Sequence, residues 1–84
     1  MTFTIPNLLD TAVATFPDRL FLKEGDEELS FAAFDQEVRR YAAALRQMGV
    51  GEGDRVGICM RKNIQQAISI VAVLRANAIF VPIL

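Results

Sequence analysis

Apolar residues recur at helical spacing most clearly between residues 31 and 48. They fall at i, i+3, i+4 and i+7 and therefore share one helix face. This apolar stripe consists of Phe31, Phe34, Val38, Tyr41, Ala42, Leu45 and Met48. The polar residues of the stretch fall on the other side, where we expect Asp35 and Arg39 to pair weakly at i,i+4. Ser30 is suited to cap the start of this helix, and Gly49 to end it in a left-handed conformation.

A second amphipathic pattern opens the chain. Thr4 can cap a helix whose first turn contains Pro6, and the segment Phe16-Pro17-Asp18 ends it because the residue before proline avoids helical angles. The apolar residues expected to share one face are Ile5, Leu8, Leu9, Ala12, Val13 and Phe16. Residues 20–24 and 27–29 then predict two short antiparallel strands joined by a turn at Gly25 and Asp26.

The last thirty residues predict a β-α-β unit. Residues 55–60 are largely apolar without polar alternation, which is typical of a strand covered on both faces. Asn63 can cap the next helix, with Gln66 completing a capping-box pattern. Apolar residues cover so much of that helix that we expect more than one layer to pack on it. Asn77 can take a left-handed C-cap, and residues 79–83 form the last strand, parallel to the first in a right-handed unit.

These elements predict one small α/β domain over residues 1–84, with three helices, a small hairpin and a β-α-β unit. The sequence contains no internal repeat and no low-complexity linker. Hydrophobic residues make up 52% of the chain, which is a large share for a domain with so small a core. Residues 80–84 are all apolar or proline. We expect this C-terminal end to be a truncation point, or a surface that another segment or protein covers.

Charge and cysteine content narrow the functional classes. Nine basic residues oppose ten acidic ones, and this balance argues against nucleic-acid binding. One cysteine without a disulfide partner and an N-terminus without signal-peptide features favour the cytoplasm. Residues 67–84 are apolar, but Arg75, Asn77 and Pro82 interrupt them, so a buried helix followed by a strand is expected instead of a membrane span.

The glycines of residues 49–53 invite comparison with a phosphate-binding loop. Such loops follow a strand and open a helix, whereas these glycines follow a helix and precede a strand, so a helix cap and a turn are expected. Arg61, Lys62 and Asn63 are better placed, after a strand and at a helix start, where they could hold an anion. No glycine-rich loop accompanies them, and a solvated loop is the alternative interpretation.

The other candidates point to structure instead of catalysis. The chain has no histidine, so Cys59 lacks the usual base of a nucleophilic thiol, and we expect it to be buried in its strand. The carboxylates Asp26, Glu27 and Glu28 suit a solvated hairpin tip. Phe31 and Phe34 lie on the apolar stripe and are expected in the core. The residues therefore predict no catalytic, cofactor-binding or metal-binding side chain in this chain.

Three segments, in order, carry a family resemblance. Residues 29–34, LSFAAF, resemble the helix start L-S/T-Y/F-x-E/A-L/F of the adenylate-forming ligases, and residues 49–56, GVGEGDRV, resemble their G-V-x-x-G-D-R-V turn and strand. Residues 74–83, LRANAIFVPI, are similar to their K/R-A-G-A-x-Y/F-V-P-I/L helix end and strand. Residues 8–18, ending in FPD, also fit their first helix. The family includes acyl- and aryl-CoA synthetases, luciferases and adenylation domains of peptide synthetases.

The resemblance implies a longer parent enzyme, of which this chain would be the N-terminal part and a partial subdomain. That enzyme would use ATP and Mg²⁺ to form an acyl-adenylate and would pass the acyl group to coenzyme A or a carrier thiol. The family's phosphate loop, nucleotide-binding segments and catalytic lysine have no counterpart in residues 1–84, so this chain alone is expected to bind no cofactor. Asn77 stands where the family usually has glycine, and Leu84 lies near a usual aspartate or asparagine.

Two alternatives remain open. The chain could be a stand-alone interaction module whose sheet edge and apolar surface dock on a partner or on a second copy. It could also be a small anion-binding domain that uses Arg61 and Lys62. As part of a ligase, its partner would be the remainder of the ligase chain.

Overall fold

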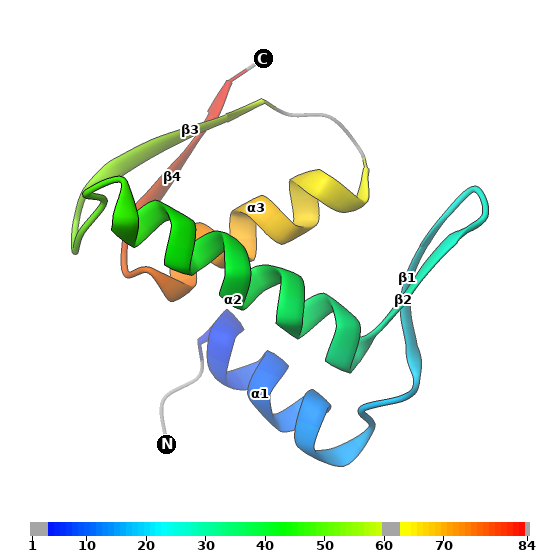
Figure 1. Ribbon diagram of the computed structural model, residues 1–84. Coiled ribbons are helices and arrows are strands. Elements are labelled where there is room, and N and C mark those ends of the chain that lie inside the picture. Colours follow the sequence, from blue (N-terminus) through cyan, green and yellow to red (C-terminus); the bar gives the residue numbers. More distant parts are fainter. Residues whose placement is uncertain (1–3, 60–62, 84) are drawn as a thin grey trace.

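The computed structural model describes residues 4–59 and 63–83, which contain three helices and two separate two-stranded sheets (Figure 1). The elements in chain order are α1 (Ile5–Thr15), β1 (Leu20–Glu24), β2 (Glu27–Ser30), α2 (Phe31–Gln47), β3 (Arg55–Cys59), α3 (Ile64–Arg75) and β4 (Ile79–Ile83). The expected α/β class, with a hairpin and a β-α-β unit, is confirmed.

Each helix begins at the capping residue that the sequence predicts. The Thr4 hydroxyl accepts a hydrogen bond from the Asn7 amide at 3.2 Å and caps α1. The Ser30 hydroxyl caps α2 by accepting from the Ala33 amide at 3.1 Å. For α3, the Asn63 side chain accepts from an amide of the first turn at 2.8 Å. These oxygens satisfy amides that have no partner within their own helices.

Two helices end in left-handed caps. Gly49 has a φ of 93° after α2, and Asn77 has a φ of 61° after α3. In the first cap the amide of Val50 donates to the carbonyl of Leu45 at 3.0 Å, the six-residue bond of a Schellman motif. The corresponding bond after α3 is 3.1 Å long. Both predicted C-caps are confirmed.

The loop after α2 is hydrogen-bonded to the loop after α3. The amide of Gly53 donates to the carbonyl of Asn77 at 2.9 Å, and the amide of Ile79 donates to the carbonyl of Asp54 at 2.7 Å. The Asp54 carboxylate also accepts from the Gly51 amide at 2.7 Å. These bonds place the starts of β3 and β4 side by side. The strands then run parallel, from the pair Arg55–Ile79 onward, as predicted.

The hairpin rests on the N-terminal end of α2 through its aromatic residue. The Phe21 ring stacks on Phe31 with centroids 4.6 Å apart and meets Phe34 edge-on at 5.0 Å. Strands β1 and β2 pair antiparallel, with an irregularity between Leu20 and Leu22. Offset and edge-on ring pairs are favourable, so these contacts fix the hairpin to the helical layer.

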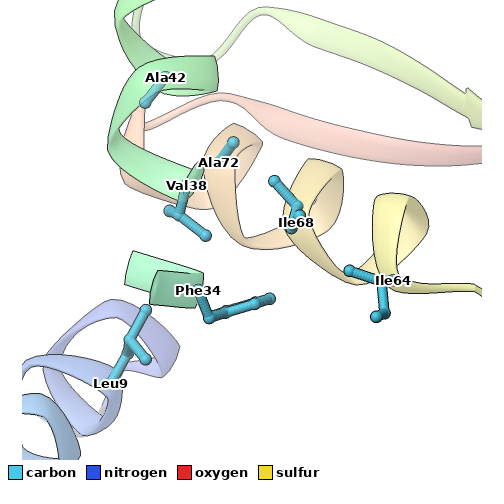
Figure 2. Packing of buried hydrophobic residues seen from close by; sticks show 7 residues of the cluster. All are labelled: Leu9, Phe34, Val38, Ala42, Ile64, Ile68 and Ala72. Atoms are coloured by element: carbon cyan, nitrogen blue, oxygen red, sulfur yellow. The ribbon is translucent and has the colours of Figure 1, made fainter. Parts of the chain in front are cut away.

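The three helices meet in one apolar core, with α3 also packed against the parallel strands (Figures 1 and 2). The buried residues of this core are Leu9, Phe34, Val38, Ala42, Ile64, Ile68 and Ala72. A second cluster of Ile58, Val73 and Ala78 joins α3 to β3 and β4. The expectation that α3 is covered by more than one layer is confirmed.

The expected burial of β3 on both faces is wrong, and two apolar patterns on the helices are only partly buried. Strand β3 is covered on one face only, because α3 packs on Val56 and Ile58 while no described helix or second sheet packs on the opposite face. Exposed large side chains on α1 show that its apolar face is only partly used by the core; these are Ile5 and Leu8, with Phe16 at the C-cap. Met48, counted in the apolar stripe of α2, is 78% exposed at its end.

Candidate functional site

Most residues that the sequence marked as candidates have structural roles. The glycines of residues 49–53 form the cap and turn that were expected. Asp26, Glu27 and Glu28 are exposed at the hairpin tip. Arg61 and Lys62 lie outside the described residues, so the predicted anion site is represented only by Asn63, whose carbonyl oxygen is engaged in capping α3.

Cys59 is exposed, and the expectation that it is buried is wrong. The cause is the uncovered face of β3, which leaves the end of the strand open to solvent. No histidine exists in the sequence to activate this thiol. Exposure therefore makes Cys59 accessible to reagents without making it a catalytic nucleophile.

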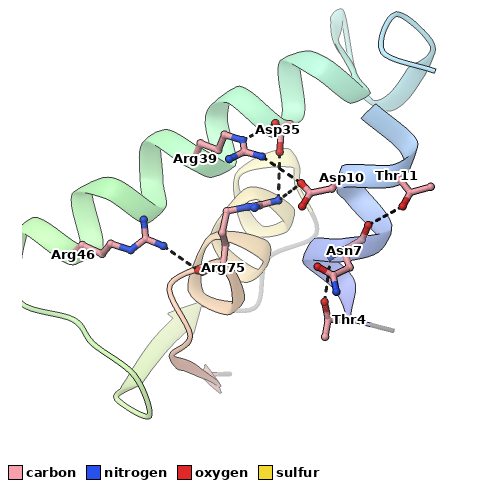
Figure 3. A network of polar contacts seen from close by, with 8 residues as sticks. All are labelled: Thr4, Asn7, Asp10, Thr11, Asp35, Arg39, Arg46 and Arg75. Atoms are coloured by element: carbon pink, nitrogen blue, oxygen red, sulfur yellow. Dashed lines mark hydrogen bonds and ion pairs between the residues drawn. The ribbon is translucent and has the colours of Figure 1, made fainter. Parts of the chain in front are cut away.

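The most organised polar group is a cluster of four charges that joins the three helices (Figure 3). Arg39 Nε donates to Asp35 Oδ2 at 2.8 Å, and Arg75 Nη2 donates to Asp10 Oδ1 at 2.7 Å. Longer contacts complete the cluster: Arg39 to Asp10 at 3.3 Å and Arg75 to Asp35 at 3.5 Å. Asp10 belongs to α1, Asp35 and Arg39 to α2, and Arg75 to α3.

The interior of this charge cluster is well shielded from water. Asp35 is only 8% exposed, and the Arg75 side chain is 15% exposed. The hydrogen bond and charge of Asp35 raise the pKa of the Arg39 guanidinium above its ordinary value. Two buried atoms, Asp35 Oδ1 and Arg75 Nε, have no hydrogen bond. The ion pair between these two residues compensates the Asp35 charge. The charges of the cluster therefore neutralise one another.

The interpretation of Asp35 from sequence is therefore wrong in part. Its pairing with Arg39 is confirmed, but the residue is buried and not on a solvated face. The burial of Asp35 could not be predicted because it depends on Asp10 and Arg75, which lie 25 and 40 residues away from it in the chain. An aspartate beside an apolar stripe is only a weak signal that a charged partner from another helix exists. We interpret the cluster as a structural link between helices.

An apolar groove lies beside the parallel strands. It has a volume of about 630 Å³ and lies between the C-terminal half of α2, helix α3 and strand β3. The groove is lined by Tyr41 and Ala44 of α2 with its C-cap Met48, by Ser69 and Val73 of α3, and by residues 56–59 of β3. None of the described lining residues is charged. The Tyr41 hydroxyl donates to Gln65 Oε1 at 2.6 Å, and both residues line the groove.

These features do not fit ATP or Mg²⁺. Within residues 4–59 and 63–83, no three carboxylate, cysteine or histidine side chains gather in a way that could hold a metal ion. The lining that residues 4–59 and 63–83 give the groove offers no cation for phosphate groups, and the charge cluster balances two arginines with two aspartates. We therefore assign no chemical step to the described residues. None of the described helices has the length and apolar character needed to cross a membrane.

Comparison with protein-family models identifies the wider context. The model described as AMP-binding enzyme matches residues 9–84. A medium/long-chain-fatty-acid-CoA/3-oxocholest-4-en-26-oate-CoA ligase of Mycobacterium marinum is 35% identical over 81 residues, which is 96% of this chain and 15% of the relative. Nonribosomal peptide synthetase 5 of Gibberella zeae is 32% identical over 80 residues, covering 95% of this chain and 1% of that protein.

Solved structures show the same fold. The N-terminal subdomain of Klebsiella oxytoca NpsA matches with a TM-score of 0.91 and 23% identity over 98% of this chain and 22% of that chain. An artificially fused adenylation–PCP di-domain from the same organism, NpsA-ThdA, matches with a TM-score of 0.86 and 25% identity over 93% of this chain and 15% of that chain.

The chain spans only a small part of its relatives, 15% of the Mycobacterium marinum ligase and 13% of a medium/long-chain-fatty-acid-CoA ligase, FadD6, of Mycobacterium tuberculosis. The order of its three motifs, the matched fold and the family match all agree with an N-terminal segment of an adenylate-forming enzyme. On this evidence the chain belongs to the AMP-binding enzyme family.

Proposed function

We propose that residues 1–84 form the N-terminal part of the AMP-binding domain of an ATP-dependent acid–thiol ligase. The observation that carries this proposal is the family match over residues 9–84. The relatives are named as fatty-acid-CoA ligases and as peptide synthetases. Both classes suggest that the whole protein activates a carboxylic acid as an acyl-adenylate and then transfers the acyl group to coenzyme A or a carrier thiol.

In this proposal the segment is a scaffold. Adenylate chemistry needs hydrogen-bond donors and cations aimed at phosphate groups, held in a site that excludes water. The described residues offer a closed charge cluster and an uncharged groove instead. The groups that bind ATP, Mg²⁺ and coenzyme A would therefore come from the remainder of the ligase chain. The single cysteine and the absence of a disulfide partner support a cytoplasmic location.

Two measurements test the proposal. The intact mass of the natural protein should exceed the 9.3 kDa of this chain, and its continuation should contain a serine- or threonine-rich glycine loop. Acid-dependent exchange of pyrophosphate into ATP should be catalysed by that longer protein and not by the 84-residue chain. A longer protein that lacks both the loop and the exchange activity would refute the assignment.

A second candidate, a stand-alone interaction module, is favoured by one observation. The outer face of the β3–β4 sheet presents Ile79, Val81 and Ile83 to solvent, and exposed apolar sheet surfaces promote association. This alternative predicts concentration-dependent self-association of the 84-residue chain. Elution as a monomer at high concentration in gel filtration would argue against it.

A further inference from the structure

Helix α1 has little stability of its own. It is eleven residues long, and isolated helices shorter than about 12–15 residues are marginal in water. The hydroxyls of Thr11 and Thr15 donate to the carbonyls one turn earlier, and such bonds slightly destabilise a helix. No acidic residue stands in its first turn and no basic residue in its last, so charged side chains do not offset its dipole. Helix α1 therefore depends on contacts with the rest of the fold.

Those contacts are sparse for a helix at the edge of the molecule (Figure 1). Leu9 is the one buried residue of α1, whereas α2 and α3 each bury four. Hollows also flank α1 on two sides. One, of about 500 Å³, lies between the first turns of α1 and the end of α3 at Arg75 and Asn77. The other, of about 190 Å³, lies between α1 and the rings of Phe21 and Phe34.

The C-terminal end of α1 is joined to the start of α2 by backbone hydrogen bonds. The helix ends at its C-cap Phe16. Beyond it, the amide of Phe31 donates to the carbonyl of Arg19 at 3.1 Å, and the amide of Ala32 donates to the carbonyl of Pro17 at 3.0 Å. These bonds hold residues 17–19 in place, so a movement of α1 would pivot at Phe16.

The body of α1 is held by one charged side chain, Asp10. Its carboxylate contacts Arg75 of α3 at 2.7 Å and Arg39 of α2 at 3.3 Å, with the Asp35 carboxylate of α2 on the far side of both guanidinium groups (Figure 3). The Asp10 side chain is 45% exposed. Dissolved ions can therefore screen its attraction to the two arginines.

We propose that α1 is a strap that opens as a unit about Phe16 while α2, α3 and the two sheets stay folded, and that Asp10 is the latch that keeps the strap closed. Segments held by few buried contacts open with a smaller free energy than the whole fold requires. Opening would uncover Phe34 and Val71, which line the smaller hollow. It would also release Arg75 from one of its two aspartates.

Amide hydrogen exchange in the purified natural protein tests the strap directly. Amides of residues 9–15 should exchange at least about tenfold faster than those of residues 38–45 in α2 and 68–74 in α3. Raising NaCl from about 0.1 M to about 1 M shortens the Debye length from about 10 Å to about 3 Å. Exchange in α1 should then speed up by about twofold or more relative to α2 and α3, because the latch is screened.

A matched pair of variants isolates the latch. Asp10→Asn removes the charge and keeps nearly the same size. It should speed exchange in α1 by about threefold or more, leave α2 and α3 unchanged, and abolish the further effect of salt on α1. Asp26→Asn is the control, because Asp26 is exposed at the hairpin tip, away from the helices (Figure 1). It should leave exchange in all three helices as it is in the wild type.

Three results would overturn the inference. Exchange in α1 as slow as in α2 and α3 would mean that α1 opens only when the whole fold does. Faster exchange of all three helices in Asp10→Asn would mean that Asp10 stabilises the whole fold and is no latch. Unchanged exchange in that variant would mean that apolar contacts alone hold α1. The wild-type measurements decide the strap even where Asp10→Asn fails to fold, and each of these results leaves the proposed function intact.

Discussion

Arg75 is the residue on which the charge cluster depends most. Its guanidinium contacts Asp10 at 2.7 Å and Asp35 at 3.5 Å, and its side chain is mostly buried. Asp35 is buried as well, and without Arg75 only Arg39, at the rim of the cluster, would compensate its charge. Uncompensated charge in a protein interior is strongly destabilising. Arg75 therefore links α3 to the other two helices more firmly than a surface ion pair could.

We expect Arg75→Met, which keeps the aliphatic stem, to lower the free energy of unfolding by about 2–3 kcal/mol. The value is smaller than for a fully broken buried pair because Arg39 still contacts Asp35. Arg40→Met is the control, since Arg40 pairs with Glu37 on the surface and should matter by less than about 0.5 kcal/mol. Urea denaturation measures both, and equal effects would show that the cluster is not a buried link.

Asn77 tests the left-handed cap after α3. Its φ of 61° is accessible to glycine without cost and to asparagine at little cost, whereas alanine is strained there. We expect Asn77→Gly to be neutral or slightly stabilising and Asn77→Ala to cost about 1 kcal/mol. Thermal unfolding of the three proteins should follow that order. If Asn77→Ala were as stable as Asn77→Gly, backbone strain would not govern this position.

The cap of α2 decides where the longest helix begins. The Ser30 hydroxyl accepts from the Ala33 amide, and the same serine ends β2, so it fixes the junction between hairpin and helix. We expect Ser30→Ala to cost about 1 kcal/mol of stability. Ser69→Ala is the matched control, because the Ser69 hydroxyl only donates to a carbonyl within α3 and should matter little. A shift of the unfolding midpoint in the Ser69 variant alone would contradict this account.

Elements are the part of the structure that local sequence signals determine well. Caps such as Ser30 and Asn77 act within a few residues, and the period of apolar residues separates helices from strands. The parallel pairing of β3 and β4 follows from the helix between them. These signals need no knowledge of distant segments, which is why the predicted and observed boundaries agree.

The burial of a side chain cannot be predicted in the same way, because it depends on contacts with segments that are distant in the sequence. The apolar run at Ile58 and Cys59 predicts a strand covered on both faces, yet one face is open and Cys59 is exposed. Conversely, Asp35 is buried because Asp10 and Arg75 arrive from other helices. The groove escapes prediction for the same reason, since its walls come from three elements.

At the scale of the whole molecule, the sequence contains more apolar side chains than the described residues bury. Ile79, Val81 and Ile83 line the outer face of the sheet, and each is substantially exposed. In a strand pattern such residues indicate coverage on that face. The longer protein that we propose would supply further chain to cover this face. We therefore expect mutational effects on this face to depend on the length of the protein.

Val81 and Val56 allow one substitution to be compared on the two faces of the sheet. Val56 packs against the Ile58 cluster, whereas Val81 lies on the outer face and is 39% exposed. In the 84-residue chain, Val56→Thr should cost about 1–2 kcal/mol, because it places a hydroxyl in an apolar contact, and Val81→Thr less than about 0.5 kcal/mol. In the longer ligase both changes should cost about 1–2 kcal/mol. Denaturant unfolding of the four variants measures the difference, and a Val81→Thr effect that stays small in the longer protein would mean that the outer face remains open there.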